Sequence, residues 1–213
     1  MHLTHTFVTA HDLELFRRWL VPLAPAELAR TSPETRRELL RGAIDGLGID
    51  LATWKWFGDA LAAEGDAFLR QVRFVMYFYP SAFLNQRSQG SSKLQRGSFG
   101  LHASLLEQAT GSRRLVPSSS DPEAVEYSST HFHRFSWLTP EDLSALQIVR
   151  PLAALRAHAH ESADARAYPP AQVPAYVERC IEDSAALIEL ARSRRSERLA
   201  LVAMLDNTDW EYE

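Results

Sequence analysis

Residues 125–138, VEYSSTHFHRFSWL, decide between an all-helical fold and a fold that contains a β-sheet. The stretch alternates in character from one residue to the next, which is the period of a strand. A strand would place one set of alternating side chains on a common face: Val125, Tyr127, Ser129, His131, His133, Phe135 and Trp137. We therefore predict a mainly α fold, or an α+β fold if the strand at 125–137 forms.

A second stretch, residues 68–79 (FLRQVRFVMYFY), fits two periods. Helical spacing joins Phe68, Val72, Val75, Met76 and Tyr79, whereas alternation joins Val72, Phe74, Met76 and Phe78. The aromatic and branched content favours a strand at 71–79, and the helical character of the neighbouring residues favours a helix. Both assignments stay open on the sequence alone.

The rest of the chain carries helix signals. Capping residues stand at Thr9, at Thr31 and Ser32 before Pro33, and at Thr139 before Pro140, and glycines at 46 and 48 end the second helix. Polar residues from 81 to 98 and from 112 to 124 resemble exposed loops. We predict six to eight helices, including a long one that starts at Thr139 and runs toward His160, in a single globular domain of residues 1–205 followed by a tail at 206–213.

Composition indicates a soluble cytoplasmic protein. The 213 residues are 46% hydrophobic and 23% charged, which is typical of a globular chain. Cys180 is the single cysteine, and the first residues lack a signal-peptide pattern, so we expect a reducing cytoplasm. No apolar run reaches the roughly 20 residues of a membrane-spanning helix. We expect no membrane association.

Charge is uneven along the chain. Residues 70–120 carry seven Lys or Arg and one Glu, and both flanking segments are acidic. The basic segment either forms an anion- or partner-binding surface or pairs with the chain's own carboxylates. The candidate binding cations are Arg87, Lys93, Arg96, Arg113 and Arg114. Aromatic neighbours suited to base stacking add a nucleic-acid interpretation, which the acidic flanks oppose: Phe74, Tyr77, Phe78, Tyr79 and Phe99.

The tail, residues 206–213 (DNTDWEYE), combines four carboxylates with Trp210 and Tyr212. Two aromatic anchors in an acidic segment can dock on a basic groove of the same chain or of a partner. Fraying of the chain end is the competing interpretation.

His131 and His133 lie two residues apart, so on a strand both imidazoles point the same way and can share a divalent metal ion. His102 is one candidate for a further ligand. The carboxylate that a cupin-like strand carries a few residues later is missing, because Arg134, Phe135 and Ser136 follow. Packing of these side chains against helices is the structural alternative.

No acid, base and nucleophile set converges in the sequence. The leading hypothesis is a non-catalytic binding or accessory protein that engages another protein through the basic central segment and the acidic aromatic tail. The alternatives are a metal-dependent enzyme using His131 and His133, and a protein that binds a phosphate ligand or nucleic acid through residues 87–114. The sequence carries no indication of oligomeric state, substrate or pathway.

Overall fold

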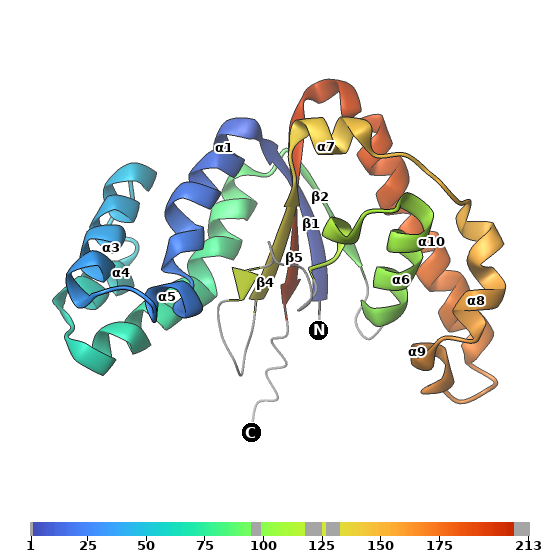
Figure 1. The fold of residues 1–213 in the computed structure, drawn as a ribbon, viewed down its shortest axis with the longest axis horizontal. Helices are drawn as coiled ribbons and strands as arrows, with labels where there is room; N and C mark the ends of the chain where they lie inside the picture. The colour runs from blue at the N-terminus through green and yellow to red at the C-terminus, as the bar shows by residue number, and fades with distance from the viewer. Residues whose placement is uncertain (1, 95–98, 118–124, 127–132, 207–213) are drawn as a thin grey trace.

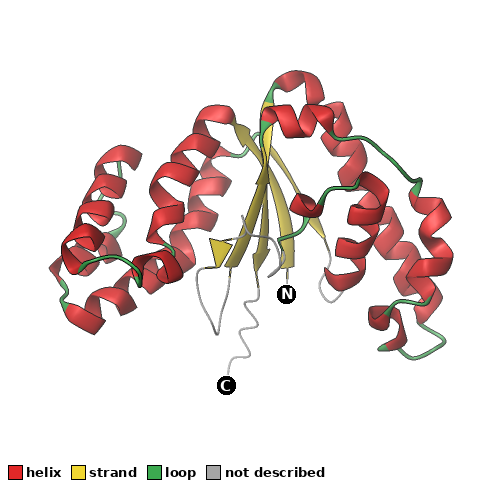
Figure 2. Cartoon of the chain, viewed as in Figure 1, coloured by secondary structure: helices red, strands yellow, loops and turns green. Residues whose placement is uncertain are grey.

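Five strands form one antiparallel sheet at the centre of the molecule (Figures 1 and 2). The computed structural model describes residues 2–94, 99–117, 125–126 and 133–206. The strands are β1 (His2–Thr9), β2 (Gly90–Leu94), β3 (Val125–Glu126), β4 (His133–Leu138) and β5 (Leu199–Asp206). Their order across the sheet is β2-β1-β5-β4-β3. Together with the surrounding helices they confirm the α+β form of the mainly α fold.

Strand β5 holds the middle of this sheet. It pairs with β1 from His2↔Asp206 to Thr9↔Leu199 and with β4 from His133↔Asp206 to Leu138↔Leu201. The sequence pattern missed both β1 and β5. Strand β5 reads LALVAMLD, a nearly continuous apolar run, because helices cover both of its faces and remove the polar alternation of a half-exposed strand.

Helices from the N-terminal half pack on one side of the sheet in two tiers (Figure 1). Helices α1 (Ala10–Leu15) and α5 (Gly65–Arg87) lie against the strands, and α2 (Pro25–Leu28), α3 (Pro33–Leu47) and α4 (Lys55–Ala62) pack further out. Helix α1 continues into a π-helical turn at Phe16–Leu20 and a 3-10 turn at Val21–Leu23.

Helices from the C-terminal half cover the opposite face (Figure 2). They are α6 (Phe99–Thr110), α7 (Pro140–Ala145), α8 (Arg156–His160), α9 (Ala163–Arg166) and α10 (Val173–Ser193). Short 3-10 turns lie at Arg113–Leu115, Leu152–Leu155 and Arg195–Glu197.

Alternation along β5 separates two hydrophobic cores. Leu199, Leu201, Ala203 and Leu205 join the core beneath α6 and α10. Ala200 and Val202 join the core beneath α1 to α5, together with Phe135 and Trp137 of β4. The sheet is therefore the shared wall of two helical layers.

A strand at 71–79 is wrong, because these residues lie inside α5. The helical spacing was the physically relevant one: Phe68, Val72, Val75, Met76 and Tyr79 are all buried on one side of the helix. Helix α5 continues through Pro80 to Arg87, so the expected loop from residue 81 also starts too early. Residues Gly90–Leu94 of that expected loop pair with β1 as strand β2.

The strand expected at 125–137 is divided. Val125 pairs with Phe135 and Glu126 with Arg134 in antiparallel register, so β3 and β4 are two strands. The long helix expected from Thr139 toward His160 is also divided: α7 ends at Ala145, and a 3-10 turn begins directly after Pro151. Pro151 disfavours helical backbone at Arg150, so one continuous helix does not cross this point, although α7 already ends at Ala145.

Three expected helix starts are confirmed, whereas a helix start capped by Asp50 is wrong, because α4 begins at Lys55. Thr9, Ser32 and Thr139 each accept a hydrogen bond from the backbone amide three residues later. Gly48 ends α3 in the left-handed conformation with φ of 61°. None of the helices that the structure describes is long and apolar enough to cross a bilayer.

Trp19 packs into a notch on α3 that two glycines create. A Cβ atom added at Gly42 would lie 2.7 Å from Trp19 Cζ3, and one added at Gly46 would overlap the indole ring itself. The spacing of four residues places both glycines on the same side of the helix, where the missing side chains admit the indole.

Replacing Gly46 with Ala therefore displaces Trp19. We expect Gly46→Ala to lower the free energy of unfolding by about 1–3 kcal/mol through overpacking, despite the higher helix propensity of alanine. Gly58→Ala is the matched control, because nothing lies within 4 Å of the added Cβ in α4. Urea unfolding should find this control unchanged or up to about 1 kcal/mol more stable. Equal effects at both positions would contradict the notch.

Candidate functional site

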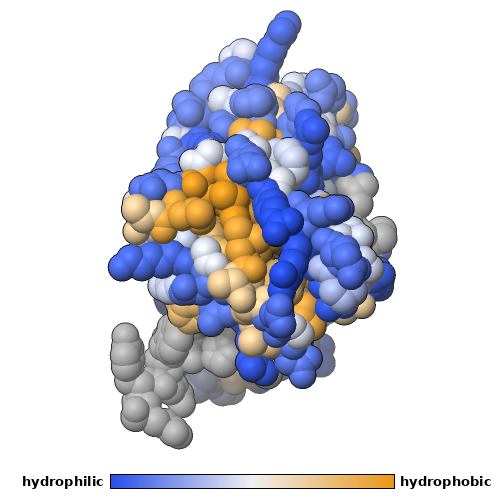
Figure 3. Space-filling model, turned by 90° about the vertical axis from the view of Figure 1, so that its left-hand side faces the viewer, coloured by the Kyte–Doolittle hydropathy of each residue, from blue (hydrophilic) through white to orange (hydrophobic). Residues whose placement is uncertain are grey.

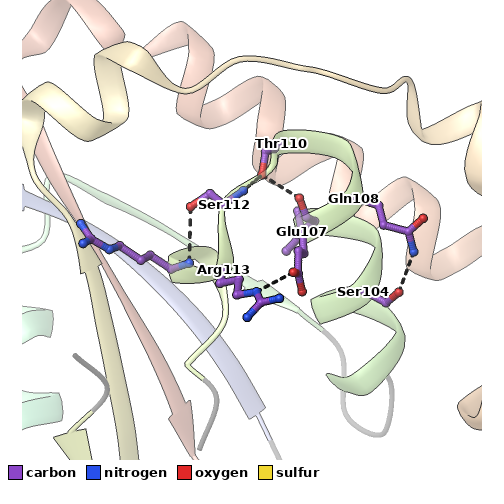
Figure 4. A network of polar contacts seen from close by, with 8 residues as sticks. Ser104, Glu107, Gln108, Thr110, Ser112 and Arg113 are labelled. Carbon is purple, nitrogen blue, oxygen red and sulfur yellow. Dashed lines mark hydrogen bonds and ion pairs between the residues drawn. The ribbon is translucent and has the colours of Figure 1, made fainter. Parts of the chain in front are cut away.

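Three arginines of the basic segment face the chain's own carboxylates. Arg87 Nε lies 3.0 Å from Asp12 Oδ1, and Arg114 Nη1 lies 3.1 Å from Asp142 Oδ2. Arg113 Nε donates to Glu107 Oε1 at 2.6 Å (Figure 4). At these three positions the basic segment pairs with carboxylates of the same chain, which is one of the two alternatives that the sequence left open.

Figure 4 shows why Arg113 turns back toward α6. Ser112 accepts from the amide of Arg114, and its own amide donates to Thr110 Oγ1, which together shape the turn after the helix. The hydrogen bond to Glu107 and the charge of its carboxylate raise the pKa of Arg113 above its usual value. The Arg113 guanidinium is thus held by the preceding helix, α6.

The other predicted site residues are scattered or lie outside the described part of the chain. Lys93 is exposed on β2. Arg96, His131, Trp210 and Tyr212 fall outside the described residues, and of His133 the structure describes only the place in β4. Within the described ranges, no three His, Cys, Asp or Glu side chains come close enough to hold a metal ion. The metal hypothesis on His131 and His133 stays a prediction.

His102 belongs to a buried polar cluster. Its Nδ1 lies 2.9 Å from Ser184 Oγ, and its Nε2 lies 3.9 Å from Asp183 Oδ2. A serine, a histidine and an aspartate are the residue types of a hydrolase triad, but His102 and Ser184 are both 0% exposed, so no substrate reaches them. The cluster therefore stabilises the contact between α6 and α10. The sequence gives no sign of this hydrogen bond, which spans 82 residues.

Burial keeps His102 neutral. Desolvation, reinforced by the nearby His5, lowers the pKa of His102 to about 4. His5 is also fully buried and has its pKa lowered to about 4 by desolvation, while its Nε2–H donates to Leu115 O at 2.6 Å. At neutral pH the approach of His102 to Asp183 is therefore not an ion pair.

The most distinctive surface feature is a cluster of aromatic side chains where α4 meets α5. We define the aromatic face as Leu51, Trp54, Trp56, Phe74 and Phe78. Phe74 is 44% exposed and Leu51 is 41% exposed, which is unusual for large apolar side chains. On the side of the molecule where α3 and α4 lie, hydrophobic residues gather into one patch bordered by hydrophilic ones (Figure 3).

Ring contacts hold the aromatic face rigid. Trp56 lies 4.7 Å from Phe74 and 5.2 Å from Phe78, measured between ring centroids. Trp54 lies 4.9 Å from Tyr79, which in turn lies 4.9 Å from the fully buried Phe57. The exposed rings are thus anchored through edge contacts to the core beneath α4 and α5.

Cations border the aromatic face. Lys55 precedes Trp56 on α4, and Arg70 and Arg73 precede Phe74 on α5. All three side chains are exposed, and none forms an ion pair with a described carboxylate. Asp59 and Asp66 stand on the same helices, and Asp50 and Glu64 lie just before them in the sequence, so the surface carries both signs.

The sequence contained part of this signal. Phe74 and Phe78 were candidates for stacking beside the basic segment, but their contacts with Trp56 depend on the packing of α4 on α5. A separate groove of about 480 Å³ lies between α1 and the start of α7. Arg17, Arg18, Glu14 and Glu141 line it, so its charges are mixed. We regard the aromatic face as the better candidate site.

Acid should destabilise the fold through the buried histidines. Their pKa values are lowered from 6.5 to about 4 in the folded chain, so the unfolded chain binds more protons between these values. The stabilisation is complete above about pH 6.5 and is lost as the pH falls toward 4. By pH 5 each histidine should have lost roughly 2 kcal/mol of stabilisation.

His102→Asn isolates one of these contributions, because an amide can still bond Ser184 but does not titrate. When the pH is lowered from 7.5 to 5, the free energy of unfolding of the parent should fall by about 2 kcal/mol more than that of the variant, as measured by urea titration. An identical pH dependence in both proteins would contradict the assignment.

Comparisons with models of known protein families, with curated proteins and with solved structures find no match to this chain. The functional conclusion therefore rests on the geometry of the aromatic face and its bordering cations.

Proposed function

We propose that the protein is a non-catalytic binding or accessory protein that engages a protein partner through the aromatic face. The observation that carries the proposal is the continuous ring network from buried Phe57 through Tyr79, Trp54 and Trp56 to exposed Phe74, in which the Trp54 and Trp56 centroids lie 6.1 Å apart. Large apolar patches rimmed by polar residues mark interaction sites on soluble proteins. As part of this proposal the protein acts in the cytoplasm, as expected from its single cysteine.

Rigid aromatic side chains suit partner binding for an energetic reason. Trp56 and Phe74 already hold each other at 4.7 Å, so little side-chain entropy remains to be lost on association. Tryptophan and arginine dominate the energetic hot spots of protein interfaces. Trp56, together with Arg70 and Arg73, supplies both residue types at one surface.

The basic segment enters this proposal through different residues than expected. Arg87, Arg113 and Arg114 are engaged with Asp12, Glu107 and Asp142. A phosphate or nucleic-acid ligand would have to compete with these carboxylates, which disfavours that alternative. Arg70 and Arg73 keep their charges exposed, and Arg70 stands one helical turn before Phe74.

Phe74→Ser tests the proposal, because it removes the most exposed ring of the aromatic face at little cost to the core. We expect at least a tenfold lower recovery of the specific partner when the variant and the parent are immobilised in extract from the source cells. A tenfold loss corresponds to about 1.4 kcal/mol, within the usual range for an interface anchor. Quantitative mass spectrometry of the bound proteins provides the measurement.

Val149→Ser is the matched control, because Val149 is a 65% exposed apolar residue outside the aromatic face. It should leave the recovered proteins unchanged. Equal recovery by the parent, Phe74→Ser and Val149→Ser, with all three equally folded by circular dichroism, would refute the proposed function.

A further inference from the structure

We infer that the aromatic face receives the acidic aromatic segment 206–213 of a second copy of this chain. The inference rests on the proposed function, since it names the occupant of the same surface. Three points support it: the chemistry of the segment, the cations near the face that have no ion pair with a described carboxylate, and the path that the segment would have to take to reach its own face.

The segment DNTDWEYE carries complementary chemistry. In an extended conformation Trp210 and Tyr212 point to one side, while Asp209, Glu211 and Glu213 point to the other. Such a strand can pack its two rings on an apolar surface while its carboxylates contact cations at the edge of that surface. Tyrosine and tryptophan bury large areas at low entropic cost, as interface anchors do.

The aromatic face offers an apolar surface for the two rings and cations for the carboxylates. Exposed Phe74 and half-buried Phe78 supply an apolar strip on α5, and Arg70 stands one helical turn before Phe74. Lys55 and Arg73 are exposed on the same two helices and are the sequence neighbours of Trp56 and Phe74. These cations have no ion pair with a described carboxylate, unlike Arg87, whose nearest carboxylate lies 3.0 Å away. They attract an acidic segment more strongly than the paired arginines do.

To reach the face of its own molecule, the segment has to pass around α5. Strand β5 ends at Asp206 in the middle of the sheet, and Trp210 follows only four residues later, which is about 14 Å of extended chain. The buried side chains of α5 point into the core, and Phe74 lies on the other side of the helix. A single helix with its side chains already has a diameter of about 10 Å, and α4 packs further out against α5 (Figure 1). A second copy meets no such limit.

Sedimentation velocity over a range of protein concentrations tests the inference, using the full chain without a C-terminal tag. We expect concentration-dependent self-association that falls at least tenfold in Phe74→Ser and in a chain that ends at Asp206. Val149→Ser should associate like the parent. Raising the salt concentration should weaken association, because the rim contacts are between exposed charges.

Mixing the two weakened variants gives the sharpest outcome. Phe74→Ser keeps an intact segment, and the truncated chain keeps an intact face, so the mixture should form a heterodimer although each variant alone is weakened. A synthetic peptide of residues 206–213 should bind the truncated chain and lose at least tenfold in affinity when Phe74→Ser is introduced there.

Three results would overturn the inference. The first is a full chain that stays monomeric at all concentrations. If the truncated chain nevertheless binds the peptide, the segment occupies the face of its own molecule. The second is a peptide that binds with and without Phe74. The third is self-association that Phe74→Ser abolishes and truncation does not change. In that last case the aromatic face remains a docking surface, so the proposed function stands while the named occupant fails.

Discussion

The position of β5 between β1 and β4 is the constraint on which the rest of the structure depends. Hydrogen bonding on both sides fixes the register of β5, and its two faces then fix which helices share a core. A shift by one residue would exchange Leu201 with Val202 and would move small and large side chains to the wrong core. The first and last strands of the described chain therefore meet at the centre, so both helical layers depend on a contact between residues nearly 200 positions apart.

The aromatic face depends on that centre through α5. Phe83 and Val72 bury one side of α5 in the core that β5 shares, which leaves Phe74 and Phe78 on the outer side where α4 packs. Tyr79 links the two levels, because its ring contacts both buried Phe57 and half-buried Trp54. The exposed rings are thus fixed by the same packing that stabilises the core, and a partner meets a surface that is already organised.

Local signals in the sequence predicted local structure well. The caps at Thr9, Ser32 and Thr139 act within three residues, and they begin helices as expected. Nonlocal features were not predictable: β5 lost its alternation because it is covered on both faces, and the bond between His102 and Ser184 depends on how α6 meets α10. The candidate site lies between these extremes, since Phe74 and Phe78 carried a visible signal but their union with Trp56 required the packing of two helices.

Hydrogen exchange of the backbone amides in His2–Thr9 and Leu199–Asp206 tests the central pairing most directly. If β5 closes the sheet between β1 and β4, its interior amides and those of β1 should be among the slowest to exchange, with the same opening free energy in both segments. Rapid exchange throughout Leu199–Asp206 while the helices stay protected would contradict the account, because the two cores would then form without the strand that separates them.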